Sequence, residues 1–114
     1  MVNLKQYQEI IESLLREIYS YDVGQNNDGI ESEIIIDREN NHYLLVDVGW
    51  NSEQEYVYGT FIHIDIKGDK IWIQRNNTEI NLAELLVEKG VNKEDIVIGL
   101  HSPFMRQFSG YSAS

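Results

Sequence analysis

Hydrophobic residues follow a helical period at the start of the chain. In residues 3–21 they recur at spacings of three, four and seven, which predicts an amphipathic helix with one buried face. The stripe contains Leu4, Tyr7, Ile10, Ile11, Leu14, Leu15, Ile18 and Tyr21. Asn3 is the predicted N-cap, and Glu12 and Arg16 have the spacing of a favourable ion pair. Because the stripe is too short for a coiled coil, we expect it to pack on the protein's own sheet.

The middle of the chain changes to a period of two, which is typical of β-strands. Predicted strands cover residues 31–37, 42–50, 55–66 and 70–74. Short polar turns join them, so the sequence predicts an antiparallel meander. The turn at Lys67-Gly68-Asp69 is the clearest hairpin signal. Strict alternation places Tyr56 and Tyr58 on the same face of the third strand as Ile62, Ile64 and Ile66.

The C-terminal third returns to helical spacing. A second helix is predicted over residues 79–89, capped by Thr78 or Asn81 and ended by Gly90. Residues 96–98 form a short strand or buried segment, and a last helical turn is expected at 104–108. The predicted fold class is α+β: an N-terminal helix, a four-stranded antiparallel β-meander and C-terminal helical segments in a single domain, residues 1–114.

Composition and net charge reduce the range of functions that the protein can have. The 114 residues are 42% hydrophobic and contain no cysteine, which predicts a packed core without disulfides or thiolate metal sites. The formal net charge of −10 and the scattered basic residues disfavour direct DNA or RNA binding. No apolar run is long enough for a membrane span and no secretory signal is visible, so we expect a cytoplasmic protein.

His63 and Asp65 are the residues with the clearest chemical potential. They stand two apart on a predicted strand, so both side chains lie on one face. Joined by His42 or His101, they have the chemistry of a zinc or iron site, or of a base and its orienting carboxylate. A His-x-Asp pair is an unspecific motif, and a hydrogen-bonded structural pair is the favoured interpretation. If these residues instead carry out chemistry, the function they predict is that of a metal-dependent or acid–base enzyme using His63, Asp65 and His101. We keep this as the alternative to a protein without catalytic activity.

Trp72 is predicted to belong to the core. It stands between Ile71 and Ile73 and therefore faces the other way on the fourth strand. An exposed tryptophan on a short strand would form an apolar patch. We therefore expect Trp72 to be largely buried under a helix.

The same hairpin carries a family resemblance that extends over nearly the whole chain. The matching segments include residues 42–45, 63–66, 70–74, 78–79, 90–91 and 95–101, with Asp37, Trp50, Gly59, Pro103 and Arg106 between and after them. In this order and spacing the chain resembles the XisI-like family, the fdxN element excision controlling factors of cyanobacteria. It departs from the family at Glu55 and Tyr56, where basic residues are usual, and at Asn92, where proline is usual.

The resemblance implies an accessory protein of programmed DNA rearrangement. XisI-like proteins act beside a XisH-like protein, which resembles restriction-type nucleases, and indirectly with a site-specific recombinase, XisF. We expect this acidic chain to bind its XisH-like partner, without a cofactor and without catalysis; a homo-oligomer stays open. The candidate partner contact consists of Glu53, Glu55 and Arg106. Signature residues of unknown role are His63, Asp65, Trp72, Gln74, His101 and Arg106.

Overall fold

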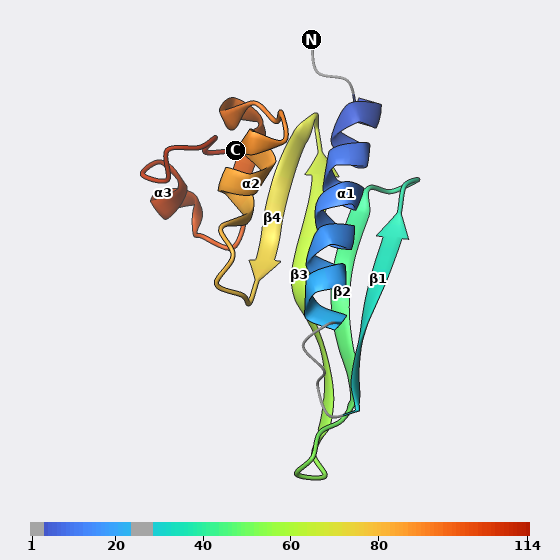
Figure 1. Cartoon of the computed structure of the whole chain (residues 1–114). Coiled ribbons are helices and arrows are strands. Elements are labelled where there is room, and N and C mark those ends of the chain that lie inside the picture. Colours follow the sequence, from blue (N-terminus) through green and yellow to red (C-terminus); the bar gives the residue numbers. More distant parts are fainter. Residues whose placement is uncertain (1–3, 24–28) are drawn as a thin grey trace.

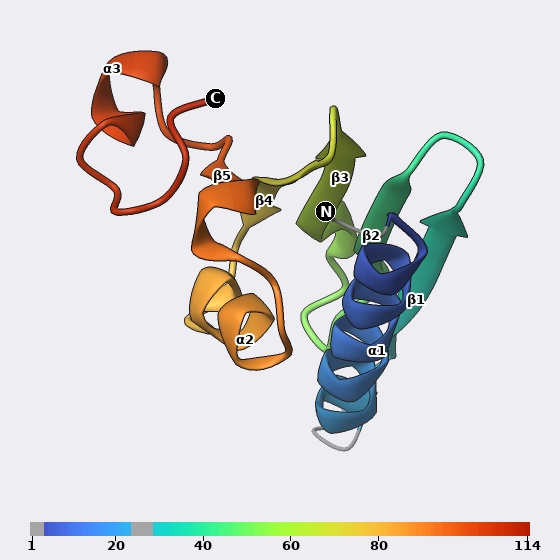
Figure 2. The same cartoon turned by 90° about the horizontal axis from the view of Figure 1, so that it is seen from above.

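A five-stranded sheet backed by a long helix forms the body of the protein. The computed structural model describes residues 4–23 and 29–114. Its elements are α1 (Leu4–Val23), β1 (Ile30–Asp37), β2 (His42–Trp50), β3 (Tyr56–Lys67), β4 (Lys70–Asn76), α2 (Leu82–Glu88), the 3₁₀ turn η1 (Lys93–Asp95), β5 (Ile96–Ile98) and α3 (Pro103–Arg106). The strand order is β1-β2-β3-β4-β5. Figure 1 shows the first four strands side by side, and Figure 2 shows β5 beside β4. The predicted α+β class, with its initial helix and antiparallel meander, is confirmed.

The fifth strand is the main addition to the predicted meander. β5 pairs with β4 in parallel, with Ile71 opposite Ile96 and Ile73 opposite Ile98. A parallel neighbour requires a crossover, and here α2 and η1 supply it. Ile96 and Val97 are fully buried, so this short segment covers what would otherwise be the exposed edge of β4.

The core lies between the sheet and the two longer helices. α1 and α2 lie on one side of the sheet, while α3 lies on the other side (Figure 2). The buried residues of the helices are Tyr7, Ile11, Leu14, Leu15, Ile18, Leu82, Ala83 and Leu86, and those of the sheet include Tyr43, Leu45, Ile62, Ile64, Ile66, Ile71 and Ile73. The ends of the predicted stripe, Leu4 and Tyr21, are exposed. In the described residues, no helix is long and apolar enough to span a membrane.

A β-bulge in β3 changes which residues of the strand point to each face of the sheet. Val46 pairs with Thr60 but its neighbour Leu45 pairs with Ile62, so Phe61 is an extra residue in β3. An extra residue reverses the alternation of faces beyond it. Tyr56 and Tyr58 therefore lie on the face opposite to Ile62, and the prediction that they share its face is wrong.

Turn and capping residues in the sequence correctly predict where several helices and strands begin or end. Gly68 and Asp69 have φ values of 54° and 67°, the left-handed pair expected of a two-residue hairpin turn. The Asn81 side chain accepts a hydrogen bond from the Glu84 amide, which confirms it as a cap. α2 therefore begins at Leu82, later than predicted, because the preceding residues form a turn in which the Thr78 hydroxyl accepts from the Ile80 amide. The predicted cap Asn3 lies outside the described residues.

The Tyr7 hydroxyl connects α1 to the C-terminal half of the chain. It donates to Asp95 Oδ2 at 2.7 Å and accepts from the Asn92 amide at 3.3 Å. Burial raises the pKa of Tyr7, and the hydrogen bond to Asp95 raises it further. The neutral hydroxyl is therefore the form that the folded state favours.

We expect Tyr7→Phe to cost about 0.5–1.5 kcal/mol of unfolding free energy at neutral pH, because one buried hydrogen-bonding group is lost. A pKa raised on folding contributes stability that is fully present below the unfolded value and is lost as pH rises through the folded value. The difference between wild type and Tyr7→Phe should therefore shrink above about pH 10. Urea unfolding of both proteins at pH 8 and in the alkaline range measures it; a difference that grows with pH would contradict the role given to Tyr7.

Candidate functional site

Two histidines and a glutamine converge on one aspartate on the sheet face that α1 and α2 leave uncovered, which we call the open face. His42 Nδ1 lies 2.7 Å and His63 Nε2 lies 2.8 Å from the same oxygen, Asp65 Oδ1. Gln74 Nε2 donates to the other oxygen, Oδ2, at 3.3 Å. We call these four residues the His–Asp cluster. The predicted pair of His63 and Asp65 is thus hydrogen-bonded, as the favoured interpretation held.

Two bulges assemble this cluster. Without the extra Phe61, His42 of β2 would stand opposite Ile64; with it, His42 stands opposite Asp65. A second bulge in β4 lets His63 pair with Arg75 while Ile64 pairs with Ile73, which leaves Gln74 as the extra residue. Bulges often redirect side chains beside functional sites.

Burial and hydrogen bonding act against each other at Asp65. The residue is only 7% exposed, and this burial raises its pKa, but the hydrogen bonds from His42, His63 and Gln74 and the electrostatic interaction with His63 together lower the pKa overall. The hydrogen bond to Asp65 also raises the pKa of His42. The cluster therefore holds an ionised carboxylate between two imidazoles.

His101 does not join this cluster. It follows β5 and lines a hollow of about 250 Å³ together with Leu82 and Ala83 of α2. That hollow also contains Ile73, whose side chain belongs to the core on the helix-covered face. The structure therefore does not bring His101 together with His63 and Asp65, as the alternative enzyme would require. The third residue beside His63 and Asp65 is His42.

Trp72 is half-buried and lies outside the core, which corrects the prediction that it is a core residue. It stands opposite Asp65 on the open face. Lys67 Nζ lies 4.3 Å from the centre of its ring, and the Arg106 guanidinium lies 5.1 Å away. Arg106 is held by the carbonyls of His101 and Gly99, to which it donates at 3.0 and 3.3 Å. Lys67 and Arg106, the last residue of the short helix α3, therefore cover the ring on the open face.

An exposed aromatic group occupies the far end of the same face. Trp50 is 58%, Tyr56 56% and Tyr58 74% exposed. Trp50 contacts Tyr56 with ring centres 5.1 Å apart, and Tyr56 stacks on Tyr58 at 6.5 Å. We call these three residues the aromatic patch. The bulge at Phe61 turned it outward, so alternation alone could not find it.

Glu53 and Glu55 lie beyond the aromatic patch, on the turn between β2 and β3. Both are exposed, and Asn51 Oδ1 accepts hydrogen bonds from both of their amides. Arg106 belongs to α3 near the opposite end of the molecule (Figure 1). The three candidate contact residues therefore lie at two separate sites on the surface and do not form one contact surface.

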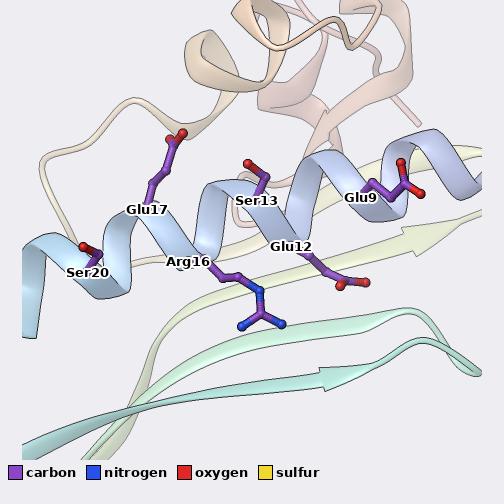
Figure 3. Close-up of a pocket in the computed structure, with 6 residues that line it drawn as sticks. All are labelled: Glu9, Glu12, Ser13, Arg16, Glu17 and Ser20. Carbon is purple, nitrogen blue, oxygen red and sulfur yellow. The ribbon is translucent and has the colours of Figure 1, made fainter.

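The charged side chains around a hollow on the outer side of α1 serve to join this helix to its neighbours. It is lined by Glu9, Glu12, Ser13, Arg16, Glu17 and Ser20, whose side chains diverge from the helix (Figure 3). Glu12 accepts two hydrogen bonds from Arg38, at 2.6 and 2.8 Å, in place of the predicted ion pair with Arg16. Glu17 accepts from Lys89 at 2.9 Å. These pairs join α1 to its neighbours.

The fold and the His–Asp cluster define a small α+β protein with one helix-covered and one open sheet face. A family model described as XisI protein matches residues 1–113, and the chain belongs to this family. It is similar to a XisI-like protein of Anabaena variabilis ATCC 29413, with 43% identity, 98% of this chain and 100% of that chain covered, and a TM-score of 0.90.

A second solved structure is described as the fdxN element excision controlling factor XisI of the same organism. It shares 25% identity with a TM-score of 0.81, and the likeness covers 97% of this chain and 98% of that one. Among curated proteins, no sequence matches the chain.

Proposed function

We propose that this protein controls the excision of a DNA element, and that it does so by binding a protein partner of the XisH-like class. Membership in the XisI family over residues 1–113 supports the first part, together with the likeness to an fdxN element excision controlling factor. The second part rests on the open face. We propose the cytoplasm as its compartment.

The aromatic patch is the observation that carries the binding proposal. Tyrosine and tryptophan are enriched at the centres of protein interfaces because they bury large areas at low entropic cost. Trp50, Tyr56 and Tyr58 are rigidly carried on paired strands and are more than half exposed. Glu31 and Glu33 are exposed on neighbouring β1, so acidic groups border the apolar surface.

Charge selects the partner. Because the whole chain has a net charge of −10, it suits a basic protein surface and not a phosphate backbone. A nuclease presents such a basic surface to DNA, so an acidic domain is suited to cover it. The site-specific recombinase then takes part indirectly, through the nuclease-like partner.

A charge reversal tests this steering. The variant Glu53→Lys with Glu55→Lys should associate with the host's XisH-like protein several-fold more slowly at low salt, because both residues are exposed beside the aromatic patch. Its unfolding free energy should change by no more than about 0.5 kcal/mol. Stopped-flow association at increasing salt measures the rate.

The matched control is Glu79→Lys with Glu88→Lys, at exposed positions beside and on α2. Two reversals of two charges each bring the net charge from −10 to −6 in both variants, so only the location differs. An unchanged rate in the first variant, or an equal slowing in the control, would remove the β2–β3 turn from the interface.

A further inference from the structure

We propose that His42, His63 and Asp65 form a binding site for one divalent transition-metal ion, with Zn²⁺ as its probe. The three residues come from two neighbouring strands, and their side chains meet on the open face. Two imidazoles and one carboxylate are a donor set that zinc and non-haem iron prefer. This site goes beyond partner binding and does not depend on it.

The distances are close to those that a metal requires. One ligand atom from each residue lies within 4.8 Å of the other two, and both nitrogens already lie 2.7–2.8 Å from Asp65 Oδ1. Ligands about 2.0–2.1 Å from a tetrahedral zinc stand about 3.3 Å apart. An ion therefore fits when the two nitrogen–oxygen separations open by about half an ångström and the two nitrogens, now within 4.8 Å of each other, settle about 3.3 Å apart. Each neutral ring then carries its proton on its other nitrogen and offers its lone pair to the metal.

Two neighbouring residues, Gln74 and Asp37, favour a bound cation. Gln74 holds the second oxygen of Asp65, the kind of outer contact that fixes a ligating carboxylate. Asp37 stands opposite His42 on β1 and adds negative potential. The side chains of His42 and His63 are 52% and 35% exposed, so an ion can enter from solvent and keep water in its remaining positions.

Zinc titration of the tag-free chain, after treatment with a chelator, tests the site. We expect one Zn²⁺ per chain in competition with a chromophoric chelator, and no competition from Mg²⁺, because imidazole donors do not suit that ion. His42→Gln should weaken Zn²⁺ binding by about 100-fold, since the loss of a direct ligand should cost at least as much as the loss of an outer contact. Asp65→Asn, which keeps the side-chain shape, should weaken it similarly.

His101→Gln is the matched control, since it removes a histidine outside the cluster. It should leave Zn²⁺ affinity unchanged. Because the His42 side chain is half exposed, His42→Gln should keep the fold, and circular dichroism checks this. Absence of saturable binding at one Zn²⁺ per chain, an unchanged affinity in folded His42→Gln, or an equal loss in His101→Gln would each overturn the site.

Discussion

Ile64→Ala should lower the unfolding free energy by about 2–5 kcal/mol, the range for truncating a fully buried isoleucine. Ile64 lies on central strand β3, has no exposed surface and belongs to the core beneath α1. The substitution removes three side-chain carbons and their buried apolar contacts. It leaves a cavity between the sheet and the helix, which the surrounding packed side chains cannot fill. Urea unfolding measures the loss.

Ile35→Ala is the matched control on the open face. Ile35 is 43% exposed and stands opposite Leu44. The same three carbons are removed, but Ile35 is already 43% exposed, so less burial is lost and the cost should be about 1 kcal/mol. Equal costs at the two positions would contradict the division into a helix-covered face and an open face.

Gly49→Ala should cost about 2–3 kcal/mol through strain and steric overlap. Gly49 has a φ of +143°, and a Cβ there would stand 2.3 Å from the Gly29 carbonyl oxygen and 3.1 Å from Ile30 Cα. Both contacts are with backbone, so no side-chain rotation relieves them. The pairing of β1 with the end of β2 should loosen first, which hydrogen exchange of the Ile30 region would detect.

Gly59→Ala provides the comparison within the same sheet. A Cβ at Gly59 meets no atom within 4 Å, and its φ lies outside the left-handed region. Its effect should be within about 1 kcal/mol of zero, with reduced freedom of the unfolded chain in its favour. A Gly59→Ala loss as large as that of Gly49→Ala would show that the packing around Gly49 is not the cause.

The element plan could be predicted because local signals agree along the chain. β2 has the predicted bounds, and the turn at Gly68 and the cap at Asn81 follow from their residue types. β5 was harder, because three apolar residues do not reveal that they pair in parallel with β4. Such pairing depends on the path of the chain through α2, which no local pattern contains.

The site was predictable only in part, because bulges depend on tertiary packing. His63 and Asp65 were found from their spacing on one strand. The position of His42 depends on Phe61 being inserted in β3, and the outward aromatic patch depends on the same residue. The sequence pattern predicts Trp72 in the core because the pattern does not show that Arg106, distant in the chain, covers the ring together with nearby Lys67.

The central claim, that the open face binds a protein partner, is tested most directly with two tyrosines of equal exposure. Tyr58, in the aromatic patch, is 74% exposed, and Tyr21, on α1, is 75% exposed. Calorimetric titration with the XisH-like protein should show Tyr58→Ala weakening the affinity by about 10-fold or more, as expected for an aromatic interface residue. Tyr21→Ala should leave the affinity unchanged. A weakening by Tyr21→Ala with none by Tyr58→Ala would place the partner on the helix-covered side and contradict the claim.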